Sequence, residues 1–163
     1  MKTVLITGAY RGLGYEVARQ LSERGWKVIL TARRNDQGSA AAAKLQNASF
    51  LELDITADAS VARVAKQVPK LDVLINNAAI IADGDQDVLT IRPEVVAQTI
   101  ATNALGALRV SQALVPRLVK CSAGRIVNVS SGAGQLSDMG TWSPAYFIED
   151  DAQRHHLHAG CRP

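Results

Sequence analysis

The sequence has few of the features that mark secreted, membrane-spanning or metal-binding proteins. Its only cysteines, Cys121 and Cys161, are too far apart for a disulfide framework or a metal-ligand spacing, which favours a reducing, cytoplasmic location. No run of about 18 apolar residues occurs, and the apolar start at 4–6 is too short for the core of a signal peptide. We therefore expect a soluble protein that is not exported and has no membrane partner.

Charge of one sign is not concentrated anywhere in the chain. The net charge of +3 comes from 18 lysines and arginines that are scattered rather than clustered, so a nucleic-acid partner has little support. There is no internal repeat. A hydrophobic content of 47% in 163 residues is ordinary for one globular domain with a single core.

Strand-like and helix-like segments alternate along the chain. Five short apolar runs are typical of buried strands: 3–6, 27–31, 50–53, 73–75 and 125–129. Four segments between them have helical periodicity: 13–24, 38–46, 59–68 and 93–120. Because the strand-like runs are apolar throughout, the pattern predicts an α/β fold with a parallel sheet covered on both faces.

Several residues indicate where helices end, begin or bend. Gly25 follows the first helical segment, where a left-handed residue is favoured, and Asp58 is a candidate N-cap of the third. Gly106 and Pro116 should weaken the long segment 93–120, so we expect it to be kinked or to form two consecutive helices.

Three glycines lie where the first predicted strand meets the first predicted helix. Gly8 suits a tight turn, Gly12 would let the backbone approach a pyrophosphate, and Gly14 would permit close packing of helix on sheet. The helix N-terminus offers amide groups to an anion. A glycine-rich turn alone also occurs in ordinary loops, but the strand before it and the amphipathic helix after it favour a dinucleotide site.

The end of the second predicted strand bears on which dinucleotide is bound. In such folds an acid at this point selects NAD, whereas arginine accommodates the 2′-phosphate of NADP. Here no carboxylate appears before Asp36, while Arg33 offers a planar set of donors and Arg11 could approach the same phosphate from the glycine turn. The alternative is that both arginines are solvated surface charges. The sequence favours NADP(H).

Taken together, four segments resemble the short-chain dehydrogenase/reductase family. The run Thr-Gly-Ala-Tyr-Arg-Gly-Leu-Gly at 7–14 is similar to the family's cofactor motif. Asn-Asn-Ala-Ala at 76–79 resembles the family's Asn-Asn-Ala-Gly, with Ala79 in place of glycine. Asp54 matches an acid that contacts adenine, and 125–131 matches the strand that leads to the active-site serine.

The resemblance covers residues 1 to about 146 and implies both a fold and a cofactor. It implies a Rossmann-type three-layer α/β/α domain over 1–146, with a doubly wound parallel sheet in the order 3-2-1-4-5 that lacks the family's last strands, and a divergent tail at 147–163. The cofactor contacts that it implies are Gly8, Tyr10, Arg11, Gly12, Leu13, Gly14, Arg33, Asp54, Ile55, Asn77, Ala78 and Ala79.

The same resemblance implies hydride transfer between a nicotinamide and a small carbonyl or alcohol. Ser131 would hydrogen-bond the substrate oxygen, Asn103 would support a water relay, and Tyr146 would be the general acid/base. A phenol with an ordinary pKa near 10 must be shifted downward to work near neutral pH. The family uses a lysine four residues after the tyrosine. Here that residue is Asp150, whose charge would raise the pKa of Tyr146 instead.

The chain after Tyr146 does not resemble the family. We hypothesise a truncation or a shifted reading frame near Phe147, which reading the gene's other frames for a Tyr-x-x-x-Lys continuation would test. His155, His156 and His158 have no cysteine beside them and fit a solvated tail better than a metal site, so no metal is predicted.

Three functions remain open at this point. The first is an NADP-dependent carbonyl reductase or alcohol dehydrogenase, and the second is an NADP(H)-binding pseudoenzyme or fragment without turnover. The third is a structural or interaction module. The predicted strand 125–129 would be an exposed sheet edge, so we also expect association through it, either as a homo-oligomer such as an edge-to-edge dimer or as aggregation.

Overall fold

The protein is built on one parallel sheet. The structure, a computed structural model, describes residues 1–81, 89–120 and 123–131. Its strands are β1 (Thr3–Ile6), β2 (Lys27–Ala32), β3 (Ala48–Glu52), β4 (Val73–Asn76) and β5 (Arg125–Asn128). They pair in parallel in the order β3-β2-β1-β4-β5, which confirms the predicted fold class and strand order.

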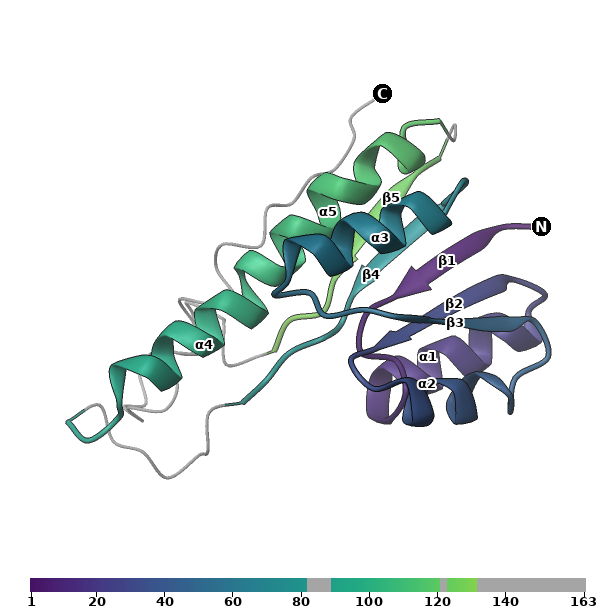
Figure 1. Cartoon of the computed structure of the whole chain (residues 1–163). Coiled ribbons are helices and arrows are strands. Elements are labelled where there is room, and N and C mark those ends of the chain that lie inside the picture. Colours follow the sequence, from purple (N-terminus) through teal and green to yellow (C-terminus); the bar gives the residue numbers. More distant parts are fainter. Residues whose placement is uncertain (82–88, 121–122, 132–163) are drawn as a thin grey trace.

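Helices cover both faces of this sheet (Figure 1). They are α1 (Gly12–Glu23), α2 (Asn35–Ala42), α3 (Asp58–Gln67), α4 (Pro93–Asn103) and α5 (Leu105–Leu118). Residues of α1 and α2 pack on one face, and residues of α3 and α5 pack on the other. Helix α4 precedes α5 along nearly the same direction (Figure 1).

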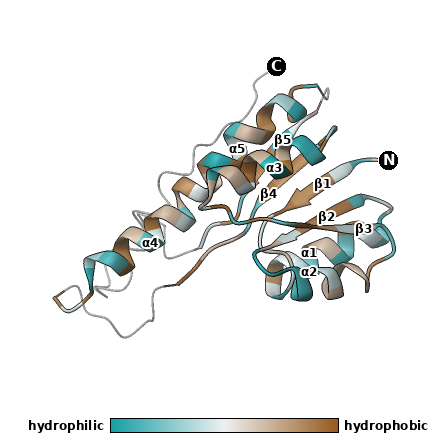
Figure 2. Ribbon diagram, in the orientation of Figure 1, coloured by the Kyte–Doolittle hydropathy of each residue, from teal (hydrophilic) through white to brown (hydrophobic). Residues whose placement is uncertain are grey.

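The core has two halves because successive strand residues point to opposite faces. In β1, Val4 and Ile6 pack with α1 and α2, whereas Leu5 packs with α3 and α5. All three are fully buried, and Figure 2 shows the central strands as largely hydrophobic. Burial on both faces explains why apolar residues follow one another in these strands instead of alternating with polar ones.

The two outer strands depart from the sequence prediction. We expected five buried strands, but β3 and β5 are only partly buried, and Val127 is 44% exposed. Within the described residues each of them has a neighbouring strand on one side only. Strand β3 also begins two residues earlier than predicted, because Ala48 and Ser49 pair with β2 although neither is strongly apolar.

One of the two predicted helix boundaries is confirmed and one is wrong. Gly25 has φ +78° directly after the cap of α1, as expected for a left-handed C-terminal glycine. Asp58 is not an N-cap: Ala57 occupies that position without a side-chain cap, and the Asp58 carboxylate instead pairs with Arg109 of α5 at 2.9 Å.

The segment 93–120 forms two helices, as predicted, but not for the predicted reason. The division falls at Ala104, whereas Gly106 and Pro116 both lie inside α5. Gly106 is needed for packing, since a Cβ there would lie 2.7 Å from the Cδ1 of Ile55. Helix α5 therefore approaches the segment that follows β3 more closely than a larger residue would allow.

Candidate cofactor and active site

Almost all the predicted site residues come together at the carboxyl end of the sheet. The glycine loop (residues 7–14) follows β1, and Arg33 follows β2. Asp54 and Ile55 follow β3, and Asn77, Ala78 and Ala79 follow β4. This edge is where open parallel α/β sheets bind their ligands.

The glycines of the loop meet three different local demands. Gly8 has φ +65°, and a Cβ on it would lie 2.9 Å from the Cα of Ala78. Gly12 has φ +59° but faces open space, since a Cβ there would meet no atom within 4 Å. Gly14 packs so closely that a Cβ would lie within 3 Å of the side-chain amide of Asn77. The loop is thus tight at its base and open at Gly12.

The first turn of α1 is available to an anion. Arg11 is the N-cap residue, it makes no side-chain cap hydrogen bond, and no acidic residue lies in the first turn. The amide groups at a helix start lack intrahelical partners and carry partial positive charge. The open space at Gly12 and these amides fit a dinucleotide's diphosphate.

Buried Thr7 ties the glycine loop to the loop after β4. Its hydroxyl oxygen accepts hydrogen bonds from the backbone amides of Asn77 (2.9 Å) and Ala78 (3.0 Å). In return, the Asn77 side-chain amide donates to the carbonyls of Thr7 (2.9 Å) and Gly8 (3.2 Å). Sequence reasoning missed Thr7 as a site residue, although a threonine at the end of a buried strand was a visible signal.

Arginines and an acid lie beside this loop. The Ala9 amide donates to the Thr31 carbonyl at 2.9 Å, which holds the glycine loop against the end of β2, two residues before Arg33. Burial alone would raise the pKa of Asp54. Hydrogen bonds from Thr56 and the charge of Arg33 outweigh it, so the pKa of Asp54 lies below its ordinary value.

Asn103 fastens the loop after β4 to the end of α4. Its side-chain oxygen accepts from the amide of Ile80 at 2.9 Å, and its side-chain nitrogen donates to the carbonyl of the same residue at 2.8 Å. Asn103 is buried, and α4 ends at it. Both side-chain amide atoms of Asn103 are thus bonded to backbone, and the water relay expected from the sequence stays a prediction.

A second buried asparagine links three elements beneath the site, and sequence reasoning did not single it out. Asn76 ends β4, and its side-chain nitrogen donates to Ser111 of α5 at 3.0 Å and to Asn128 of β5 at 2.8 Å. Its side-chain oxygen is buried without a partner among the described residues. The side chain of Asn76 thereby links β4, which leads to Asn77, with β5, which leads to Ser131.

Of the predicted catalytic residues, Asn103 and Ser131 lie in the described part of the chain. Ser131 is exposed and lies three residues after the end of β5, on the same edge as the glycine loop. Tyr146 and Asp150 lie outside the described residues, as do the three histidines of the tail. In the part of the chain that is described, no cluster of three metal-ligating side chains occurs, and no helix combines the length and apolarity needed to cross a membrane.

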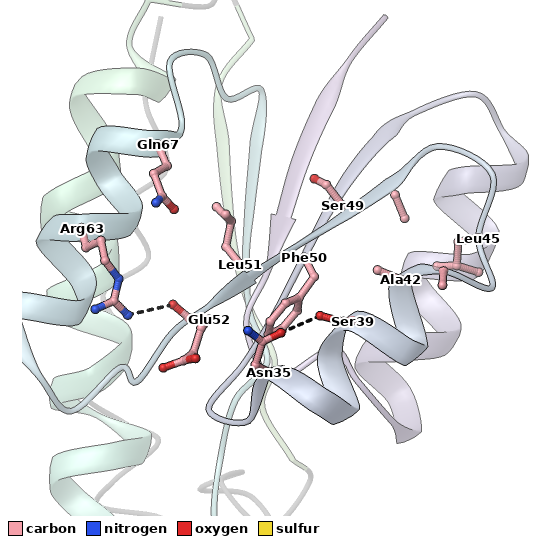
Figure 3. Close-up of a pocket in the computed structure, with 12 residues that line it drawn as sticks. Asn35, Ser39, Ala42, Leu45, Ser49, Phe50, Leu51, Glu52, Arg63 and Gln67 are labelled. Carbon is pink, nitrogen blue, oxygen red and sulfur yellow. Dashed lines mark hydrogen bonds between the residues drawn. The ribbon is translucent and has the colours of Figure 1, made fainter.

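A cavity of about 590 Å³ lies away from this edge (Figure 3). It is bounded by α2, the outer side of β3 and α3, and none of the predicted site residues lines it. Arg63 of α3 reaches toward β3 and donates to the backbone carbonyl of Glu52 at 3.3 Å (Figure 3). No residue of the glycine loop lines this cavity, so the geometry of the loop, and not the cavity, marks the candidate cofactor site.

The family follows from comparison with known proteins. The model of the short chain dehydrogenase family matches residues 2–146. The chain belongs to this family. Short-chain dehydrogenase relatives that resemble it include (+)-neomenthol dehydrogenase from Arabidopsis thaliana, 34% identical over 83% of this chain. Another is (-)-isopiperitenone reductase from Mentha piperita, 34% identical over 81% of this chain.

Solved structures of short-chain dehydrogenases also share the fold. One, a short chain dehydrogenase/reductase family protein, superposes with a TM-score of 0.84 at 28% identity over 94% of this chain and 63% of its own. The present chain spans 55% and 57% of the length of the two curated short-chain dehydrogenases named above. Because the chain matches little more than half of each, whole-protein activity and substrate do not transfer with the family.

Proposed function

We propose that this chain is an NADP(H)-dependent oxidoreductase that transfers hydride between the nicotinamide and a small carbonyl or alcohol. The observation that carries the proposal is the glycine loop, where an uncapped helix start and open space at Gly12 lie beside tightly packed Gly8 and Gly14. Membership of an oxidoreductase family supports the same reaction class.

The proposed cofactor contacts divide along the carboxyl edge of the sheet. Gly12, Leu13 and Gly14 would present backbone amides to the diphosphate, and Asp54 with Ile55 would border the adenine. The loop 77–79 would lie along the nicotinamide half, held in place by Thr7 and Asn103. The cofactor, when bound, supplies or accepts the hydride.

In the proposed reaction Ser131 hydrogen-bonds the substrate oxygen and Tyr146 exchanges a proton with it. Both roles come from the family resemblance. Asn103 is proposed to act here by positioning Ile80 and the loop after β4, because both of its amide atoms are engaged there.

The preference for NADP(H) rests on charge at the end of β2. Arg11 and Arg33 form no ion pair among the described residues, although the charge of Arg33 acts on Asp54, whereas Arg34 pairs with Asp36 at 3.2 Å. An arginine without an acidic partner suits a phosphate, and the acid that would accept from a free ribose hydroxyl is missing at this strand end.

A second candidate function is NADP(H) binding without turnover. The observation that favours it is Asp150, which stands where the family has a lysine that lowers the pKa of the tyrosine. A carboxylate would raise that pKa, and general acid/base help is worth roughly 10²- to 10⁴-fold in rate. A pseudoenzyme and a fragment are both consistent with this substitution.

Binding and turnover separate the two functions. Dissociation constants of NADPH and NADH are measured by cofactor fluorescence on the purified chain, and NADPH consumption is followed with a panel of aldehydes and ketones. Turnover that is lost in Tyr146→Phe supports the enzyme. Binding without turnover, which Asp150→Lys then restores, supports the second function. A folded chain that binds neither nucleotide contradicts both.

The organisation, location and partners of the chain are also proposed. We propose a dinucleotide-binding domain at 1–146 and a separate tail at 147–163, which the extent of the family match supports. A cytoplasmic location is supported by the two widely separated cysteines. We further propose a homo-oligomer formed through a sheet edge, supported by the half-exposed Val127 of β5.

A further inference from the structure

Arg11 rests on an aromatic ring at the mouth of the glycine loop. Its guanidinium carbon lies 5.2 Å from the centroid of the Tyr10 ring, within the range of a cation–π interaction. The Tyr10 ring is half-buried and packs against the core on the α1 and α2 side, whereas Arg11 is exposed. The ring is therefore an anchored platform beneath an exposed cation.

The arginines near this edge differ in what holds them. Arg34 pairs with Asp36 at 3.2 Å, so its charge is largely compensated. Arg33 acts on Asp54 and helps to keep the pKa of that carboxyl low. Among the described residues, Arg11 is the one of these three that lies over an aromatic ring, and it forms no ion pair there.

An aromatic partner leaves a guanidinium able to bind phosphate. Stacking on a ring uses the face of the guanidinium plane, whereas the five N–H donors lie along its edge. A carboxylate would occupy those donors and would have to be displaced. The ring also restricts the arginine rotamers, so less side-chain entropy is lost when a phosphate is bound.

Arg11 is placed beside the end of β2. The hydrogen bond from the Ala9 amide to the Thr31 carbonyl joins the residue before Tyr10 to the residue two positions before Arg33. In the proposed cofactor site this is where the ribose 2′-phosphate of NADPH would lie. NADH has a hydroxyl there and gains nothing from a fixed cation.

We propose that Tyr10 is a specificity-determining positioning residue, which selects NADPH over NADH by holding the Arg11 guanidinium at the 2′-phosphate position. The inference rests on the proposed function, because it requires a bound dinucleotide. It predicts an effect on the ratio of the two affinities and not on dinucleotide binding in general. The tyrosine ring is required and its hydroxyl is not.

The test compares three variants of the full chain with the wild type. Dissociation constants of NADPH and NADH are measured by the fluorescence of the bound nucleotide. Tyr10→Leu is expected to weaken NADPH binding about two- to fivefold more than NADH binding, which is the strength of an exposed cation–π contact. Tyr10→Phe keeps the ring and should retain the wild-type ratio. Arg34→Ala is the matched control and should change the ratio by less than about twofold.

The remaining outcomes contradict the inference in distinguishable ways. Equal weakening of both nucleotides by Tyr10→Leu would show that Tyr10 only supports the loop. If Tyr10→Phe lost the preference for NADPH over NADH, the tyrosine hydroxyl and not the ring would be responsible for that preference. If the wild type bound both nucleotides equally, the inference would be contradicted, but dinucleotide binding would stand. If the folded wild type bound neither nucleotide, the proposed function would be contradicted as well.

Discussion

Two glycines of the cofactor loop share a backbone conformation but differ in their surroundings. Gly8 and Gly12 both have positive φ, a region that costs a non-glycine residue about 1–2 kcal/mol. Only Gly8 is also crowded, since a Cβ would lie 2.9 Å from the Cα of Ala78, a backbone atom that cannot simply rotate away. The two positions therefore separate backbone strain from steric exclusion.

We predict that Gly8→Ala is more destabilising than Gly12→Ala in the absence of nucleotide. Gly12→Ala should lower the free energy of unfolding by about 1 kcal/mol. Gly8→Ala adds the cost of overpacking and should lower it by roughly 2–4 kcal/mol. Urea unfolding followed by circular dichroism measures both. Equal losses would mean that the contact with Ala78 relaxes without cost.

The lowered pKa of Asp54 predicts a dependence of stability on pH. Burial alone would raise this pKa, but the hydrogen bonds from Thr56 and the charge of Arg33 bring it below the ordinary 3.8. The folded state thus favours the carboxylate. Its contribution to stability is present above the unfolded-state pKa and is lost as the pH falls through the lower folded-state pKa.

Asp54→Asn is therefore expected to destabilise the chain at pH 6 and to matter progressively less below about pH 4. Asparagine keeps an acceptor for Thr56 but removes the charge that faces Arg33. The free energy of unfolding is measured for both proteins across this range. A difference that stays constant with pH would contradict the lowered pKa of Asp54 in the folded state.

Local pattern predicted which loops carry the site but not how they are fastened together. The three glycines and Arg33 could be placed from their positions after strands. The double acceptor role of Thr7 and the contact of Asn103 with Ile80 could not, because they join segments about 70 and 23 residues apart. Such bonds depend on the tertiary arrangement, which periodicity does not encode.

At the level of elements, the prediction succeeded where burial decides the structure. It failed where a residue's conformation or contact depends on a segment distant in sequence. Strand β1 is buried on both faces, and its predicted limits match the structure. Strand β3 was placed two residues late because Ala48 and Ser49 owe their strand conformation to pairing with β2. Asp58 looked like a cap but pairs with Arg109, a partner that sequence proximity could not reveal.

The asparagine at the end of β4 yields an element-scale prediction. Asn76 donates to both Ser111 and Asn128, so Asn76→Ala removes the side-chain hydrogen bonds from β4 to α5 and β5 and should cost about 1–3 kcal/mol of unfolding free energy. Ser111→Ala leaves the bond to Asn128 in place and should cost less than about 1 kcal/mol. Denaturant midpoints compare the two variants. If Ser111→Ala lowered the free energy of unfolding more than Asn76→Ala, the contribution of Ser111 would not come from its bond to Asn76.

The described sheet has two unlike edges. At the β3 edge, Arg63 donates to the backbone carbonyl of Glu52, and α2 and α3 rise on either side of the strand. At the β5 edge, Val127 is 44% exposed, and no further strand is present within residues 1–81, 89–120 and 123–131. Native proteins protect such edges with charge or with covering segments, and the β3 edge has both.

Association is therefore expected at the β5 edge and not at the β3 edge. Light scattering at tens of micromolar should show the wild type as a dimer or larger. Val127→Lys places a charge on the β5 edge strand and should shift the mass toward the monomer, because an inserted lysine discourages strand pairing. Ser49→Lys, at an exposed residue of β3, is the matched control. It should leave the mass unchanged, because Arg63 already occupies a backbone carbonyl of that edge strand. A wild type that is monomeric, or a mass that falls only with Ser49→Lys, would contradict this assignment.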